Sequence, residues 1–147
     1  MKRNCLLRRL AVLLFSLVSS TAVWPADLKV SDAWMRALPG EAPGGGYFLL
    51  LNRGKQPVVL VGASSAAFGH VMMHRTAQER GVSRMLPVET VEVPAEGRVV
   101  FAPGGYHLML ILPTRKIAVG ERIPVTLEFA GGEKLTAEFQ VRGPAGQ

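Results

Sequence analysis

The chain is poor in the residue types on which most catalytic sites are built. Its single cysteine, Cys5, lies in a segment that we expect to be removed, and its only aspartates are Asp27 and Asp32. Without cysteine, the processed chain has no disulfide, no thiolate nucleophile and no thiolate metal ligand. The sequence also lacks H-E-x-x-H, G-x-S-x-G and paired acidic motifs. We therefore expect that the protein is not an enzyme.

A strong excess of one charge is also missing once the N-terminus is set aside. Residues 1–26 begin with four Lys and Arg, continue with an apolar stretch at 10–18 that is too short to span a bilayer, and reach small residues at 20–22. This pattern predicts a secretory signal peptide at 1–22, or less favourably to 26, and hence an exported protein. The remaining residues carry 13 Lys and Arg against 11 Asp and Glu. This near balance gives no support for nucleic-acid binding.

Helical periodicity is absent, whereas strand-like alternation is frequent. In residues 122–130 and 134–141 apolar side chains alternate with polar ones, and the Gly-Gly-Glu between them predicts a hairpin. Short segments bounded by Gly, Pro and Asn predict further strands at 27–33, 46–52, 57–63, 70–75, 88–93, 98–102 and 106–112. The sequence therefore predicts an all-β domain at 27–142, either a β-sandwich or a Greek-key barrel, with a short tail at 143–147.

Imidazole and thioether side chains are what the sequence offers for chemistry. Beyond the signal peptide the histidines are at 70, 74 and 107, and the methionines are at 35, 72, 73, 85 and 109. Four of them have the spacing His74-x10-Met85-x21-His107-x-Met109. In a strand at 106–112, His107 and Met109 share one face because side chains alternate. Thioether sulfur is a poor ligand for zinc, calcium or magnesium and a good ligand for Cu(I), so a set of two imidazoles and two thioethers favours Cu(I).

The other soft side chains are more simply explained by packing. Met usually fills gaps in a core, and an isolated His on a strand is more often structural than a ligand. We interpret His70 and Met72 in this way, although both would share a strand face with His74 and could supplement the site. Packing roles are also expected for Met35, Met73 and Tyr106. We place His74 at the end of its strand and Met85 after a loop at 76–84.

The four-residue spacing resembles the H-x10-M-x21-H-x-M motif of the PCuAC family of periplasmic copper chaperones. The resemblance covers almost all of the processed chain, including "AWMRALPGEAPGGGYFLLLNRG" (33–54) and "MLPVETVEVPAEGRVVFAPGGYHLML" (85–110). It implies a cupredoxin-like β-sandwich that binds Cu(I) through His74, Met85, His107 and Met109. It also implies copper delivery, often alongside a Sco-type thioredoxin-like protein, to the copper-A centre of cytochrome c oxidase.

This sequence departs from many relatives at two places. They have H-E-M after the first histidine, where this chain has His-Arg-Thr and so lacks a methionine at position 76. Some relatives have a His- and Met-rich tail that binds Cu(II), which the ending "VRGPAGQ" does not resemble. We therefore do not expect a second, Cu(II) site in such a tail.

Two other functions are compatible with the same sequence. The four ligands could serve copper scavenging or tolerance, and the strands could form a metal-free immunoglobulin-like interaction domain. Stoichiometric Cu(I) binding would exclude the metal-free domain. A blue-copper electron carrier is excluded because its trigonal site needs a cysteine thiolate.

Overall fold

The computed structural model describes residues 27–40 and 42–146, so the predicted signal peptide lies outside the described residues. Ten strands form the described chain: β1 (Leu28–Arg36), β2 (Gly44–Asn52), β3 (Val58–Ser64), β4 (Phe68–Glu79), β5 (Val82–Pro87), β6 (Val91–Val93), β7 (Gly97–Phe101), β8 (Tyr106–Pro113), β9 (Arg122–Phe129) and β10 (Lys134–Arg142). This confirms the all-β prediction. Within these ranges there is no helix, and hence none that could span a bilayer.

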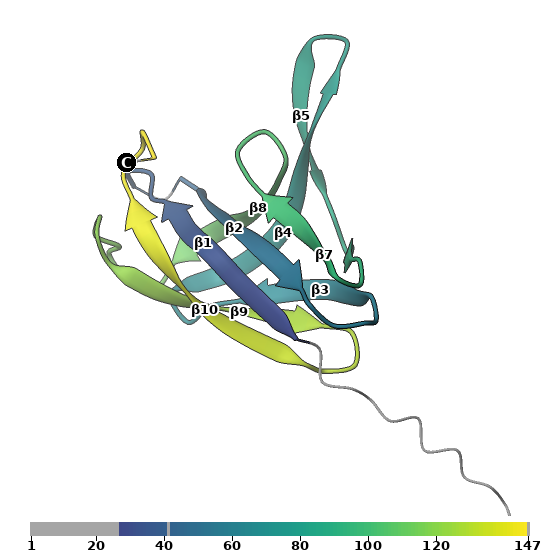
Figure 1. The fold of residues 1–147 in the computed structure, drawn as a ribbon. Helices are drawn as coiled ribbons and strands as arrows, with labels where there is room; N and C mark the ends of the chain where they lie inside the picture. Colours follow the sequence, from purple (N-terminus) through teal and green to yellow (C-terminus); the bar gives the residue numbers. More distant parts are fainter. Residues whose placement is uncertain (1–26, 41, 147) are drawn as a thin grey trace, which may run out of the picture.

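The strands form one continuous sheet in the order β5-β4-β8-β7-β2-β1-β10-β9-β3-β6. The sheet curls over on itself, because β3 contacts β4 and β6 contacts β2 although these pairs are far apart in the strand order. Figure 1 shows the result, with β1, β2 and β10 in front of β3 and β4. The two layers of the predicted sandwich are therefore parts of a single sheet, with the core between them.

The β9–β10 hairpin shows how the alternating sequence builds this core. The two strands pair antiparallel, as the predicted hairpin requires, with Leu127 opposite Leu135. The apolar positions of β9 are all buried, and Phe139 and Val141 are buried in β10. The core continues through Phe48 of β2, whose ring stacks on Phe101 of β7 at 4.3 Å between centroids. These contacts fix the layer on which the candidate site is built.

A long hairpin at the β5 end of the sheet differs from the sequence prediction. Residues 76–84 were predicted to be a loop, but β4 continues to Glu79 and β5 begins at Val82. Arg80 and Gly81 connect them, both with positive φ (51° and 80°), which is the backbone of a two-residue type I′ turn. The hairpin stands away from the body of the protein (Figure 1). Because every β5 residue is exposed, there is no buried face and hence no apolar alternation to reveal it.

Asn52 at the end of β2 is the one buried polar residue outside the candidate site among the described positions. Its amide nitrogen donates to the carbonyl oxygens of Gln56 (2.8 Å), Val93 (3.3 Å) and Pro94 (3.1 Å), and its oxygen accepts from the Gly54 amide (2.9 Å). Asn52 therefore ties β2 to the end of β6.

Replacing Asn52 with alanine should lower the free energy of unfolding by about 2–3 kcal/mol, since it leaves buried carbonyl groups without a partner. Urea denaturation of the two proteins measures the loss. Metal affinity should not change, because Asn52 is not among the residues of the candidate site. An unchanged urea midpoint would contradict the role assigned to this side chain.

Candidate metal centre

The central strand of the site is β8, which pairs with β4 on one side and with the start of β2 on the other. Leu108 and Leu110 point into the core and are fully buried. His107 and Met109 alternate with them and therefore lie on the opposite face. The core thus holds one face of β8 and fixes the direction of the two candidate ligands on the other.

Strand register brings the other two candidates to the same face. His74 of β4 lies directly opposite His107 of β8, and Met85 of β5 lies opposite Thr76, two residues further along β4. Directly opposed residues in an antiparallel pair project from the same side of the sheet. His74, Met85, His107 and Met109 therefore share one face of three adjacent strands. His74 lies in the middle of β4, so its predicted place at a strand end was wrong.

The two imidazoles are adjacent and lack hydrogen-bond partners for most of their nitrogens. Their ring centroids lie 6.0 Å apart. His107 Nδ1 lies 3.1 Å from the Gly105 carbonyl oxygen, which assigns the ring proton to Nδ1 and leaves a lone pair on Nε2. His107 Nε2 and both nitrogens of His74 are buried without a partner. Because buried polar atoms are nearly always paired, these orphaned nitrogens fit a metal that would accept their lone pairs.

Electrostatics keeps the metal-binding form of His74 available near neutral pH. Burial lowers the pKa of His74 from its ordinary value, and the charge of a protonated His107 would lower it further. A metal bound by His74 must displace any proton on the ligating nitrogen. A lowered pKa therefore reduces the competition between proton and metal at neutral pH.

A hollow of about 270 Å³ opens beside the His107 imidazole. Its lining includes Thr76, Met85, His107 and Met109 together with Arg36, Gly45 and Tyr47. The depth of the candidates differs sharply, since His107 is 6% exposed and Met85 is 61% exposed. A metal at this face would therefore be held from below by His107 and remain accessible from the side of Met85.

The wall of this hollow on the β2 side depends on a glycine, Gly45, which the sequence analysis did not identify. Gly45 lies opposite Met109 in the β2–β8 pairing, and a Cβ atom at Gly45 would collide with the Tyr47 hydroxyl. Tyr47 in turn packs on Trp34 with 4.5 Å between ring centroids, and the Arg36 guanidinium lies over both rings. Sequence reasoning missed these residues because only the cross-strand pairing brings them to the site.

The remaining histidine and methionines separate into core and surface. Met35 and Met73 are buried, as predicted. Met72 is 44% exposed and His70 is exposed, so a packing role for these two side chains was wrong. No group of three His, Cys, Asp or Glu side chains lies close together in the part of the chain that the structure describes. The further donors on the face of His74 and His107 include the thioethers of Met85 and Met109, which favour Cu(I) over zinc.

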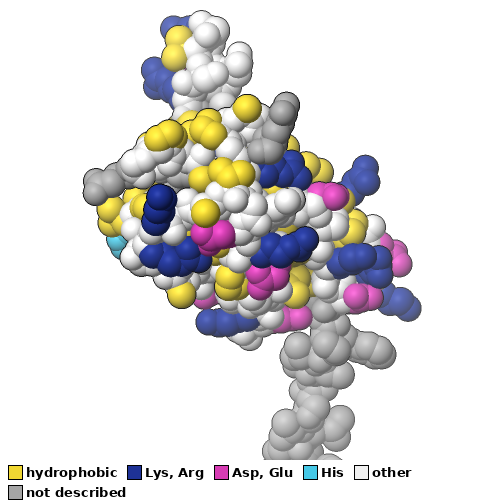
Figure 2. Space-filling view, turned by 90° about the vertical axis from the view of Figure 1, so that its left-hand side faces the viewer, with side chains coloured by type: hydrophobic (Ala, Val, Ile, Leu, Met, Phe, Trp, Pro, Cys, Tyr) yellow, Lys and Arg dark blue, Asp and Glu magenta, His cyan; other side chains and the backbone are white. Residues whose placement is uncertain are grey.

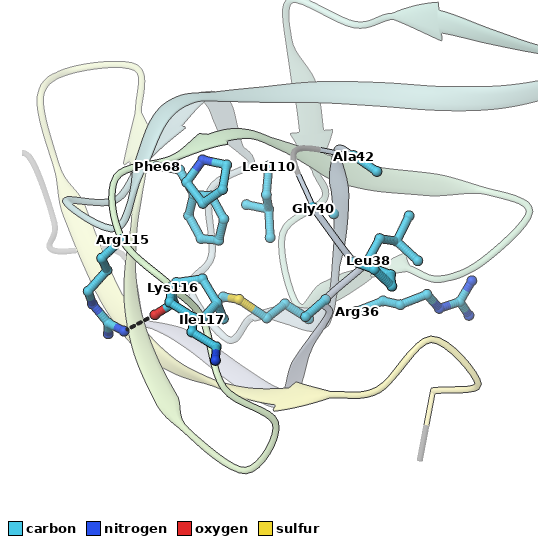
Figure 3. Close-up of a pocket in the computed structure, with 14 residues that line it drawn as sticks. Arg36, Leu38, Gly40, Ala42, Phe68, Leu110, Arg115, Lys116 and Ile117 are labelled. Carbon is cyan, nitrogen blue, oxygen red and sulfur yellow. Dashed lines mark hydrogen bonds between the residues drawn. The ribbon is translucent and has the colours of Figure 1, made fainter.

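A second hollow, of about 320 Å³, lies on the other side of the residues that connect β1 to β2 (Figure 3). Met35, Phe68, Leu110 and Ile117 give it an apolar lining, and Arg115 and Lys116 lie at its rim. Hydrophobic side chains gather below the projecting hairpin in the view of Figure 2, with basic side chains around them. No imidazole lines this hollow, so it is not a candidate metal site.

Known proteins resemble this chain in sequence and in fold. The model of the LpqE-like family matches residues 28–141. The PCuAC domain of PmoF2, solved with copper bound, is 30% identical, with a TM-score of 0.67 over 80% of this chain and 93% of that domain. The Cu(I) form of DR1885 from Deinococcus radiodurans is 25% identical, with a TM-score of 0.58 over 84% of this chain and 83% of that protein.

A relative known by sequence is Lxx21020 of Leifsonia xyli subsp. xyli (strain CTCB07), which carries a lipoprotein name. It is 29% identical over 120 residues, which are 81% of this chain and 72% of the relative. The family match extends from β1 into β10 and so includes all four candidate ligands. The chain belongs to the LpqE-like family and has the fold of PCuAC domains.

Proposed function

We propose that this protein is a periplasmic copper chaperone that binds one Cu(I) through His74, Met85, His107 and Met109. The observation that carries the proposal is the set of orphaned imidazole nitrogens of His74 and His107, on the face that also holds Met85 and Met109. The copper-bound PCuAC domain and the Cu(I) form of DR1885 support the choice of metal. The predicted signal peptide and the lipoprotein name of a relative support the location.

The proposed ligand set suits transport of copper rather than permanent storage. Neutral imidazole and thioether ligands hold Cu(I) without a thiolate, so a partner that offers thiolates can take the metal. Met85, the most exposed of the four, lies on the outermost strand of the sheet. The metal is thus cargo, and its release needs no rearrangement of the core behind β8.

We further propose that the acceptor is the copper-A centre of cytochrome c oxidase, alone or together with a Sco-like thioredoxin-fold protein. The accessible position of Met85 and the resemblance of the sequence motif to that of the PCuAC family support this assignment. Copper scavenging or tolerance would use the same four ligands without an acceptor. Incubating the Cu(I)-loaded protein with an apo copper-A domain and then oxidising the mixture with ferricyanide separates the two, since only delivery yields a two-copper centre that shows the absorption of the one-electron-oxidised, mixed-valence form.

A metal titration of the processed protein tests the proposed site. We expect one Cu(I) per chain in competition with a chromogenic Cu(I) chelator, and zinc that is lost on desalting, because thioether sulfur is a poor zinc ligand. Met109→Leu is the matched variant, since Leu has nearly the volume of Met and should cost less than about 1.5 kcal/mol of stability. Equal retention of zinc and Cu(I), or a Met109→Leu protein with unchanged Cu(I) affinity, would contradict the assignment.

A further inference from the structure

We propose that Met72 and His70, together with Met109, form an outer copper position through which Cu(I) reaches and leaves the four-ligand site. This inference rests on the proposed function, because it concerns the path of the same metal. It assigns a role to two side chains that the structure places at the surface rather than in the core.

The burial of β4 is the first observation. Met73 is buried and His74 is half-buried, whereas Met72 is 44% exposed and His70 is exposed. A large thioether at the surface contributes little to stability, so packing does not explain it. His70 and Met72 alternate with the core-facing Met73 and therefore lie on the face that carries His74. The strand thus presents three successive outward donors, of which only His74 belongs to the four-ligand site.

The pairing of β4 with β8 is the second observation. Met72 lies directly opposite Met109, just as His74 lies opposite His107. Directly opposed Cβ atoms in such a pair are about 4.5–5.5 Å apart, and diagonal neighbours remain within reach of long side chains. The two thioethers can therefore meet at one metal ion, and His70 is a diagonal neighbour of Met109 that can supply a third donor.

The two cross-strand pairs, His74–His107 and Met72–Met109, place metal-binding side chains next to one another from the buried to the exposed end of this face. The His74–His107 pair contains the 6% exposed His107, and the next pair contains the exposed Met72. Met109 belongs to both donor sets, so it can keep hold of the copper while the other ligands are exchanged. Copper would then leave the imidazoles one bond at a time without ever being free in solution. Met72 is not one of the four ligands, so it should scarcely affect the affinity of the four-ligand site for Cu(I).

Methionine-methyl NMR of the processed protein gives a direct test. With one equivalent of Ag(I), a redox-stable substitute for Cu(I), the methyl signals of Met85 and Met109 should shift. With further Ag(I) the signal of Met72 should shift as well. Met35 and Met73 are internal controls, since both are buried on the core side. A Met72 methyl that stays in place at excess Ag(I), while those of Met85 and Met109 move, would overturn the outer position and leave the proposed function intact.

A kinetic comparison tests the path itself. Met72→Leu should slow removal of Cu(I) by a chelator about tenfold, equivalent to about 1.4 kcal/mol in the exchange barrier, with the equilibrium affinity nearly unchanged. Val61→Leu is the control, because Val61 is similarly exposed on β3, outside the ligand-bearing strands. Unchanged release from Met72→Leu would refute the path. Absence of Cu(I) binding by the unmodified protein would instead refute the proposed function.

Discussion

Replacing His74 with leucine should reduce Cu(I) affinity by about 100-fold or more and leave the metal-free protein at least as stable as before. Removal of a group that only orients a metal ligand typically costs 10–100-fold in affinity, so loss of a ligand should cost no less. Both nitrogens of His74 are buried without a partner, and one such atom costs about 1–3 kcal/mol. Leucine removes that penalty and is close to histidine in size. Metal binding and folding stability should therefore change in opposite directions.

Chelator competition measures the affinity, and urea denaturation of the metal-free proteins measures the stability. His70→Leu is the matched control, since it makes the same change four residues earlier on the same face of β4. This control should keep one tightly bound Cu(I), with a stability change within about 0.5 kcal/mol. A His74→Leu protein that unfolds far more easily yet holds copper as tightly would show that His74 is structural.

The four candidate ligands could be identified from the sequence because local rules constrain them. The alternation in β8 places His107 and Met109 on one face, and the spacing to His74 and Met85 carried the family resemblance. The β9–β10 hairpin was predictable for a similar reason, since its apolar positions are buried against one core. For β8 and for this hairpin, a burial pattern was present in the sequence itself.

The surroundings of the site could not be predicted, because they depend on pairing between distant segments. Gly45 lies opposite Met109 only because of the β2–β8 register. The Tyr47 hydroxyl occupies the space over Gly45, which it can do only because Gly45 has no side chain. Strand β5 left no pattern because both of its faces are exposed. As a result, Met85 was expected after a loop, although strand pairing fixes its place opposite Thr76. Thr76 thus occupies the position where relatives have the missing methionine, on the face of the candidate ligands.

Acid should weaken copper binding steeply if both imidazoles are ligands. A ligating nitrogen must be free of its proton, whereas thioethers do not titrate, so each bound imidazole adds one proton to the competition. An ordinary histidine has a pKa of about 6.5, and that of His74 is lowered, first by burial and then by the charge of His107. His74 therefore joins the competition only in more acidic solution than an ordinary histidine. Log affinity should first fall with a slope below two protons per copper.

At pH well below the lowered pKa of His74, the slope should approach two if both imidazoles are ligands, or about 100-fold in affinity for each pH unit. The lowered pKa of His74 also determines how the stability of the metal-free protein depends on pH. Titration of His74 leaves that stability unchanged above about pH 6.5 and lowers it as the pH falls toward the folded-state pKa of His74, because there the unfolded chain binds more protons.

Competition titrations between pH 7 and pH 4, corrected for protonation of the chelator, measure the slope. His74→Leu should lower the limiting slope from two to one, whereas His70→Leu should leave it at two. An affinity that stays constant across this range would exclude both imidazoles and require a site of methionines alone. Such a result would leave the orphaned nitrogens of His74 and His107 without a function, since a metal held by thioethers does not compete with protons.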